Sequence, residues 1–125
     1  MTTENQPIRI LQATVSNDKG GLTGYICQNY RYIDKKQVQF DFLTYETELD
    51  FRAEFEKMGA RFFVVPKPSH FLAYYQALKQ INSQHRYKAI HFNISYANFI
   101  PLLAARLAGF SKIICHSHST EIDDK

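Results

Sequence analysis

The fold is decided by the stretch Ile8-Arg-Ile-Leu-Gln-Ala-Thr-Val15, which is followed directly by the turn cluster Ser16-Asn-Asp-Lys-Gly-Gly21. This run of β-branched and apolar residues opens after Pro7 and stops at turn-forming residues, so it predicts a strand over residues 8–15. From Leu22 onward, apolar residues recur at helical spacing, which predicts an amphipathic helix that ends before residues 34–36. The chain therefore begins with a strand that leads through a glycine turn into a helix.

The same alternation of strand and helix continues through the rest of the chain. Alternating or continuous apolar runs predict four more strands, at residues 38–45, 62–65, 87–92 and 112–115. Helical spacing predicts three more helices: one at about residues 51–58, one from about His70, and one that Ser95 or Asn98 caps and Gly109 ends. The expected core face of the last helix consists of Ile100, Leu103, Ala104 and Leu107.

Every crossover between consecutive strands contains a helix, which predicts a parallel sheet that helices cover on both faces. Right-handed crossovers then require an α/β, Rossmann-like, doubly wound topology in which the strand order reverses beside the first strand. We expect one domain over residues 8–120, preceded by a flexible N-terminus at residues 1–7. Residues 121–125 are expected to form a tail or the start of a further segment.

The composition also indicates a single folded domain. Of the 125 residues, 45% are hydrophobic and 14% aromatic, which is enough apolar material for one core. Charged residues make up 22% of the chain and the net charge is +3, which excludes disordered, collagen-like and coiled-coil chains. Because the basic residues are scattered along the sequence, nucleic acid is not an expected partner.

The sequence carries no pattern of a secreted or membrane-spanning chain. The first residues lack a basic and apolar leader, and the longest apolar segment, residues 99–110, is short and contains Arg106. We expect a cytoplasmic protein, with peripheral contact at the inner face of the cell membrane as an open alternative. Cys27 and Cys115 lie in apolar runs without ligand spacing, so both are expected to be free, buried thiols.

Three polar segments follow predicted strand ends, at residues 17–21, 91–95 and 116–120. In an open parallel sheet, ligands bind beyond the carboxyl ends of the strands, where the strand order reverses. The sequence therefore predicts that these three segments meet in one site.

The glycine pair in the first of these segments has two interpretations. Gly20 and Gly21 stand where a helix begins, and the unpaired backbone N–H groups of a helix start bind phosphate. A tight turn without any ligand explains the same glycines. A dinucleotide site with Glu46 on the ribose is a minor alternative, because the glycine spacing departs from G-x-G-x-x-G.

Two histidines after the last strand also admit two interpretations. His116 and His118 alternate along an extended segment and could hold a metal ion, with His91 as a third ligand. The favoured interpretation is that neutral imidazoles and the neighbouring hydroxyls bind a sugar or a phosphate. On this interpretation no metal is expected.

Three segments taken together resemble the N-terminal domain of family 4 glycosyltransferases. They are residues 8–21, the segment Gln39-Phe-Asp-Phe-Leu-Thr-Tyr45, and Leu102-Leu-Ala-Ala-Arg-Leu-Ala-Gly109 with His116-Ser-His-Ser-Thr120. The resemblance covers residues 8–120 and is strongest to the branch that builds bacterial capsular polysaccharides and exopolysaccharides. It implies one half of a GT-B architecture, in which the N-terminal domain receives the acceptor and a C-terminal domain holds the nucleotide-sugar donor. It also implies transfer with retention of anomeric configuration, without a bound metal or a permanent cofactor.

The resemblance implies roles for individual residues. Gly20 and Gly21 match the glycine pair whose backbone approaches the donor diphosphate. His118 matches the histidine beside the transferred sugar and is the candidate catalytic residue. Four further residues are expected to contact the sugar or the acceptor: His91, Asn93, His116 and Ser119.

The donor-binding half of the family lies outside these 125 residues. Sugar transfer needs a closed cleft that stabilises the leaving diphosphate and excludes water, so the chain alone is expected to have no useful turnover. The expected partners are a nucleotide sugar, a glycan or lipid-linked acceptor, and the missing C-terminal domain. The alternative is a stand-alone interaction module that pairs with a separate donor-binding subunit. Apolar surface left open by the missing half favours a homodimer.

Overall fold

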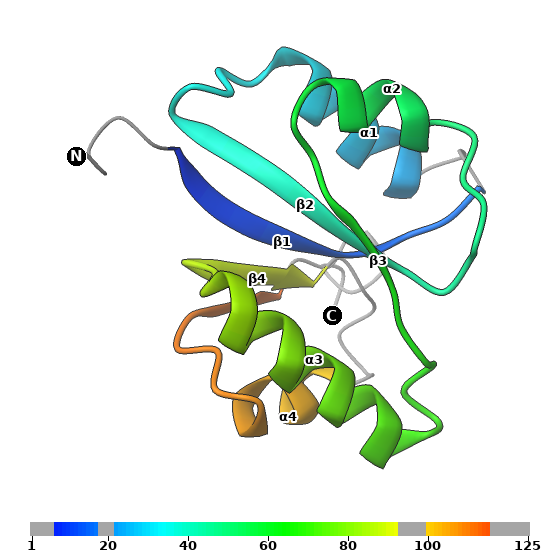
Figure 1. The fold of residues 1–125 in the computed structure, drawn as a ribbon, viewed down its shortest axis with the longest axis vertical. Helices are drawn as coiled ribbons and strands as arrows, with labels where there is room; N and C mark the ends of the chain where they lie inside the picture. Colours follow the sequence, from blue (N-terminus) through cyan, green and yellow to red (C-terminus); the bar gives the residue numbers. More distant parts are fainter. Residues whose placement is uncertain (1–6, 18–21, 93–99, 116–125) are drawn as a thin grey trace, which may run out of the picture.

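The computed structural model describes residues 7–17, 22–92 and 100–115, which form a five-stranded sheet between two pairs of helices (Figure 1). In chain order the elements are β1 (Ile8–Val15), α1 (Leu22–Tyr32), β2 (Val38–Thr44), α2 (Arg52–Lys57), β3 (Phe62–Val64), α3 (Phe71–His85), β4 (Ala89–Phe92), α4 (Ile100–Leu107) and β5 (Ile113–Cys115). Strand and helix alternate throughout, as the apolar spacing predicts.

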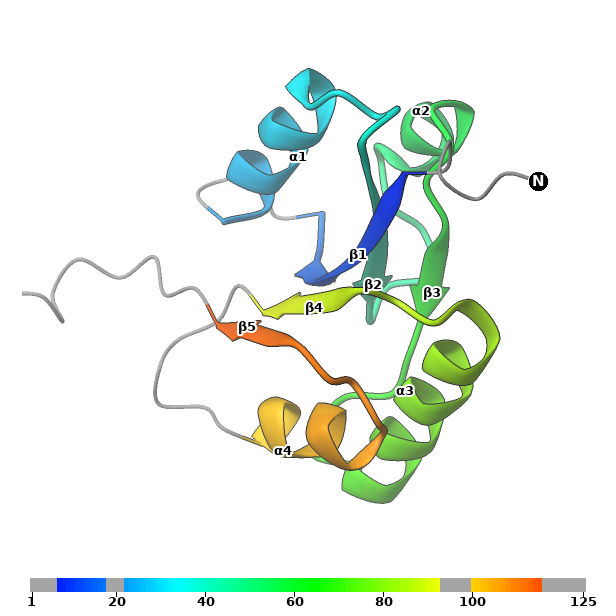
Figure 2. The same cartoon turned by 90° about the vertical axis from the view of Figure 1, so that its left-hand side faces the viewer.

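All strand pairs are parallel and the order across the sheet is β3-β2-β1-β4-β5. β1 therefore occupies the centre, and the chain reverses its direction of travel across the sheet beside β1. Helices α1 and α2 cover one face and α3 and α4 cover the other (Figures 1 and 2). The predicted Rossmann-like, doubly wound topology is confirmed.

Strand alternation divides the core between the two faces of the sheet. Along β2, Phe40 and Phe42 pack against α1 and α2, whereas Leu43 packs toward α3 and α4. Successive side chains of a strand point to opposite faces, so one strand supplies both cores. The α1/α2 core is mainly aromatic and the α3/α4 core mainly aliphatic, and the largest aromatic members of the first are Tyr30, Phe40, Phe42, Phe51, Phe55 and Phe62.

The buried face of α4 differs from the face that the sequence predicts. Ala104 is buried as expected, but Ile100, Leu103 and Leu107 are 38%, 45% and 56% exposed. The buried residues are instead small, namely Pro101, Ala104, Ala105 and Ala108, and Leu102 packs against the core partly buried. Small side chains allow α4 to approach α3 closely, and since nearly the whole helix is apolar, periodicity alone did not distinguish the two faces.

Two further expectations require correction. β4 begins at Ala89 and not at Tyr87, because Arg86 adopts a left-handed conformation with φ 53° that ends α3 and redirects the chain. Cys115 is exposed and not buried, because it lies on β5, the outermost strand of the described sheet, whereas Cys27 is buried in the α1/α2 core. Both thiols are free, as predicted.

No helix in the described part of the chain is both long and apolar enough to cross a membrane.

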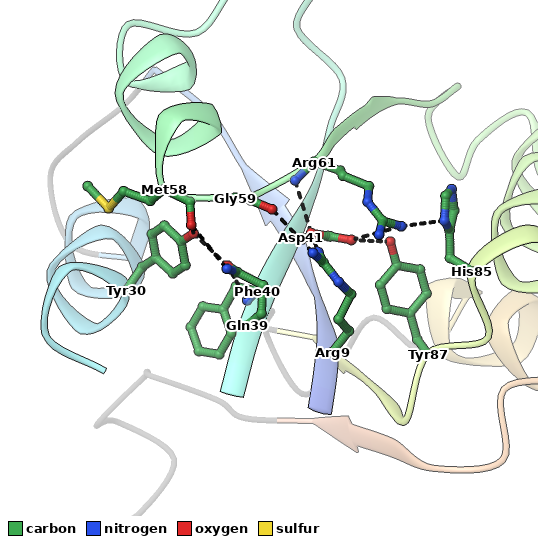
Figure 3. A network of polar contacts seen from close by, with 10 residues as sticks. All are labelled: Arg9, Tyr30, Gln39, Phe40, Asp41, Met58, Gly59, Arg61, His85 and Tyr87. Atoms are coloured by element: carbon green, nitrogen blue, oxygen red, sulfur yellow. Dashed lines mark hydrogen bonds and ion pairs between the residues drawn. The ribbon is translucent and has the colours of Figure 1, made fainter. Parts of the chain in front are cut away.

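A buried carboxylate joins the amino-terminal ends of the strands (Figure 3). Asp41 on β2 is fully buried, and its Oδ1 accepts from Arg9 Nη1 at 2.5 Å and from the Arg61 backbone N–H at 2.9 Å. Its Oδ2 accepts from the Tyr87 hydroxyl. A buried charge is tolerated only when it is paired and hydrogen-bonded. Arg9 on β1, Arg61 just before β3 and Tyr87 just before β4 together provide these contacts.

We expect Asp41→Asn to lower the free energy of unfolding by about 3 kcal/mol, because it leaves the half-buried Arg9 guanidinium without its counter-charge. Urea unfolding measures the difference. The matched control is Asp34→Asn on an exposed turn, where a change below about 0.5 kcal/mol is expected. Equal losses in the two variants would contradict a structural role for the buried charge.

The buried tyrosines predict a loss of stability at alkaline pH. Burial, together with the nearby Asp41 charge, raises the pKa of Tyr30 from 10.0 to about 12. Above pH 10 the unfolded chain loses this proton while the folded chain keeps it, so the folded state binds more protons between pH 10 and 12. The free energy of unfolding should therefore fall as pH rises through this window, by about 1.4 kcal/mol per pH unit for each such tyrosine.

Tyr30→Phe should flatten this pH dependence by the contribution of one tyrosine, as followed by urea unfolding at several alkaline pH values. Tyr32→Phe is the matched control, because the Tyr32 side chain is 80% exposed. An unchanged slope in Tyr30→Phe would show that its proton does not contribute to alkaline unfolding.

Candidate functional site

The carboxyl ends of all five strands lie along one edge of the sheet, which we call the carboxyl edge. Three of these strands are adjacent there, because Ala13 of β1 pairs with Phe92 of β4, and Phe92 pairs with Cys115 of β5. Two of the polar segments predicted to form the site therefore continue from neighbouring strand ends. This arrangement is a consequence of the parallel topology alone.

His91 is the one predicted site residue that lies within the described part of the chain. The others are outside it: Gly20, Gly21, Asn93, His116, His118 and Ser119. His91 Nδ1 is 3.0 Å from Gln12 Oε1 on β1, and a carbonyl oxygen can only accept, so Nδ1 carries a proton and donates to Gln12. The imidazole and Gln12 line a small cavity of about 160 Å³ between α1 and the sheet. A contact between His91 and the acceptor stays a prediction.

A side-chain clamp fixes the loops that leave β1 and β2. Asn17 Nδ2 donates to Glu46 Oε1 at 2.7 Å and to the Glu48 carbonyl at 2.9 Å, and Asn17 Oδ1 accepts from the Asp50 backbone N–H at 2.9 Å. The second oxygen of Glu46 accepts from the Asn17 backbone N–H at 3.2 Å. Both oxygens of Glu46 are thus engaged within the protein, which makes this carboxylate a loop clamp and argues against the dinucleotide alternative.

An apolar groove of about 770 Å³ opens beside this clamp, on the α3/α4 side of the carboxyl edge. Its residues all follow the carboxyl end of a strand or lie at the start of a helix: Tyr45, Lys67, Pro68, Ser69, Phe71, Ile100 and Leu103. Burial raises the pKa of the Tyr45 hydroxyl, which keeps this side of the groove uncharged at neutral pH. Lys67 is the only charged residue among the described residues of the lining.

The sequence did not predict the apolar groove, because Ile100 and Leu103 were placed in the core. One signal in the sequence could have found it. Helix α4 carries apolar residues around most of its circumference, and only one side of a helix can face the core. The side with the larger apolar residues was then available to line a surface groove.

Metal binding gains no support from the described residues. Across residues 7–17, 22–92 and 100–115, no three His, Cys, Asp or Glu side chains come together in a group that could hold an ion. The proposed ligand pair His116 and His118 lies outside these ranges, so the metal interpretation is not decided by this finding.

Comparison with known proteins places the chain among sugar-transfer proteins. Residues 19–124 match the model of a family described as Glycosyltransferase Family 4. The Bacillus subtilis (strain 168) protein named "Putative glycosyltransferase EpsF" is 34% identical over 116 residues, which cover 90% of this chain and 30% of that protein. The chain therefore spans less than a third of this relative.

The fold is also found in a solved structure. MurG of Acinetobacter baumannii superposes with a TM-score of 0.59 at 15% sequence identity, over 89% of this chain and 34% of the MurG chain. At this identity the likeness shows the shared fold and nothing finer.

We expect Asn17→Ala to release the loop between β2 and α2, because it removes the two donors and the acceptor of the clamp. The free energy of unfolding should fall by about 1 to 2 kcal/mol, and the Asp50 amide should exchange with solvent faster. Hydrogen–deuterium exchange measures the second effect. Thr47→Ala, an exposed change in the same loop, is the control and should leave the Asp50 amide unaffected. Equal exchange in both variants would show that the clamp does not order the loop.

Proposed function

The chain belongs to glycosyltransferase family 4, and from this we propose that it is the acceptor-side half of an enzyme that moves a sugar from a nucleotide sugar to a lipid-linked acceptor in polysaccharide biosynthesis. The described sheet is the Rossmann-like half of a GT-B fold. The proposal includes retention of anomeric configuration, transfer without a metal, and a donor held by a second domain. It takes the nucleotide sugar as a substrate and includes no permanent cofactor.

The apolar groove is the observation that carries the choice of acceptor. A sugar acceptor alone offers hydroxyl groups, and a surface that binds it would present mainly polar side chains. The groove presents Phe71, Ile100 and Leu103 instead, with Lys67 at its side. This combination suits a hydrocarbon chain that carries a phosphate, because apolar contacts bind the chain and a cation binds the phosphate. A lipid-linked acceptor has both features.

The position of the groove supports the same proposal. It lies on the carboxyl edge, where Asn93 and His116 each follow one of the paired residues Phe92 and Cys115 by a single peptide bond. We assign His116, His118 and Ser119 to the wall beside the transferred sugar, and His91 and Asn93 to the acceptor. The backbone of Gly20 and Gly21 is assigned to the donor diphosphate, since a helix start offers unpaired N–H groups to phosphate.

The same chemistry explains why this half is proposed to be inactive alone. The transition state places positive charge on the sugar and additional negative charge on the leaving diphosphate, and both need preorganised groups in a site from which water is excluded. One half of a cleft leaves the diphosphate in water, so hydration competes with each protein contact. Binding of the acceptor lipid, by contrast, depends only on the groove and should persist.

The test measures binding and transfer separately. The chain should bind a fluorescent polyprenyl phosphate, and Leu103→Asp should weaken this binding about tenfold, because it replaces an apolar contact worth about 1.4 kcal/mol with a charge. Lys67→Gln should weaken it about threefold through loss of the phosphate contact. No sugar transfer is expected from the chain alone with any member of a panel of nucleotide sugars.

Tyr32→Asp is the matched control, because Tyr32 is an exposed apolar residue on α1, across the sheet from the groove. It should bind the lipid as the unchanged chain does. Equal weakening in Leu103→Asp and Tyr32→Asp would exclude the groove as the acceptor site. Sugar transfer by the chain alone would refute the need for a second domain.

A further inference from the structure

A basic cleft of about 570 Å³ opens at the amino-terminal edge of the sheet, opposite to the carboxyl edge. Its residues precede or begin β1, β3 and β4, or end α3: Pro7, Ile8, Arg9, Arg61, His85, Arg86 and Lys88. The length of β1, about 23 Å at 3.3 Å per residue, separates this cleft from the candidate transfer site. The cleft is therefore not the sugar-transfer site, and it has no role in the function proposed above.

The charge of the cleft is strongly unbalanced. Among the described residues, four cationic side chains and no carboxylate line it, and Asp41, which pairs with Arg9, is buried beneath. The four cations and one anion leave an excess of three positive charges, which equals the net charge of the whole chain, +3. All other charged residues of the chain balance one another. This excess of positive charge lies in one concave site, where low-dielectric walls strengthen its field.

Asp41 does not neutralise the exposed part of this cluster. Its two oxygens are occupied by Arg9, by the Arg61 backbone and by the Tyr87 hydroxyl, and the Arg61 guanidinium lies 3.9 Å away (Figure 3). A guanidinium has five N–H donors, so Arg9 and Arg61 keep donors beyond those used here. Among the residues that the structure describes, neither Arg86 nor Lys88 takes part in an ion pair, and both side chains are exposed.

His85 supplies a further donor. The Arg61 guanidinium donates to His85 Nδ1 (Figure 3), which must accept, so the imidazole is neutral and its proton is on Nε2. Burial and the positive charges of Arg61 and Arg9 lower the pKa of His85, which agrees with this neutral form. The Nε2–H group adds hydrogen-bonding capacity to the cleft without adding charge.

The backbone at Arg86 places one of these cations at the cleft. Arg86 ends α3 with φ 53° and ψ 66°, a left-handed conformation that favours glycine or asparagine. The other two positive φ values in the described chain, at the turns after α2 and α4, occur at glycines, Gly59 and Gly109. Arg86 is the one described residue other than glycine with a positive φ, and its cationic side chain lines the basic cleft.

We propose that the basic cleft binds the phosphate groups of a multiply charged anion. Arg86 and Lys88 contact the anion from the rim, and Arg9 and Arg61 supply further donors from the floor. Phosphate fits this site because guanidinium groups bind its oxygens in pairs and because three surplus charges require a ligand of more than one negative charge. A soluble diphosphate and the headgroup of an anionic phospholipid share this chemistry.

Inorganic pyrophosphate is the probe for the first test, by isothermal titration calorimetry with the whole chain. Binding with a Kd of about 1 mM or tighter is expected, and added salt should weaken it. Arg86→Gly should weaken binding about fivefold to tenfold and, without pyrophosphate, leave the melting temperature unchanged or higher, because glycine relieves the left-handed conformation. If Arg86 had only a structural role, Arg86→Gly would not weaken pyrophosphate binding while leaving the melting temperature unchanged or higher.

Lys88→Gln should weaken pyrophosphate binding by a similar factor. Lys79→Gln is the matched control, because Lys79 is an exposed cation in the middle of α3 that contacts Tyr75 and does not line the cleft. Its affinity for pyrophosphate should equal that of the unchanged chain.

Cosedimentation with vesicles distinguishes the two sources of phosphate. A lipid headgroup is identified if the chain binds anionic phospholipid vesicles more tightly than neutral ones. Pyrophosphate should then displace the chain from the vesicles, and Arg86→Gly and Lys88→Gln should reduce vesicle binding. Pyrophosphate binding without this vesicle binding would identify a soluble anion. The proposal is overturned if neither probe binds, or if the two cleft variants bind the probes as well as Lys79→Gln does.

Discussion

β1 pairs in parallel with β2 on one side and β4 on the other, and the rest of the structure depends on this central position. A parallel neighbour cannot be reached by a hairpin, so a crossover helix joins each strand from β1 to β4 to the next strand. Since both faces of β1 are buried, the helices must divide between the two faces, α1 and α2 on one and α3 and α4 on the other. The same constraint collects all strand ends at one edge and all strand starts at the other.

The two edges of the sheet therefore have different chemistry. At the carboxyl edge, Asn17 and Glu46 order the loops by neutral and single-charge hydrogen bonds, and an apolar groove lies beside them. At the amino-terminal edge, Asp41 is buried beside two arginines and a tyrosine, and four cationic side chains line the cleft above it. The two proposed ligands, a lipid-linked acceptor at one edge and an anion at the other, would therefore not compete for the same surface.

Helix α4 connects the packing of the core with the surface of the candidate site. Its alanines contact the core beside α3, and this close approach turns Leu103 and Leu107 outward. Large apolar side chains on the surface usually mark a place where another molecule binds. Because small residues of α4 face the core, its larger apolar residues lie on the surface, and this apolar surface is the basis for the proposed lipid-linked acceptor.

The sequence by itself determined the order of strands and helices and the parallel sheet, because apolar periodicity and turn residues are local and the crossover rules follow from them. It also identified the family, since the motifs are themselves sequence. Only the tertiary structure decided that α4 buries Ala105 and not Leu103, that Glu46 clamps Asn17, and that Arg9, Arg61, Arg86 and Lys88 meet in one cleft. These features depend on contacts between residues distant in the chain, and scattered charges give no local pattern until folding brings them together.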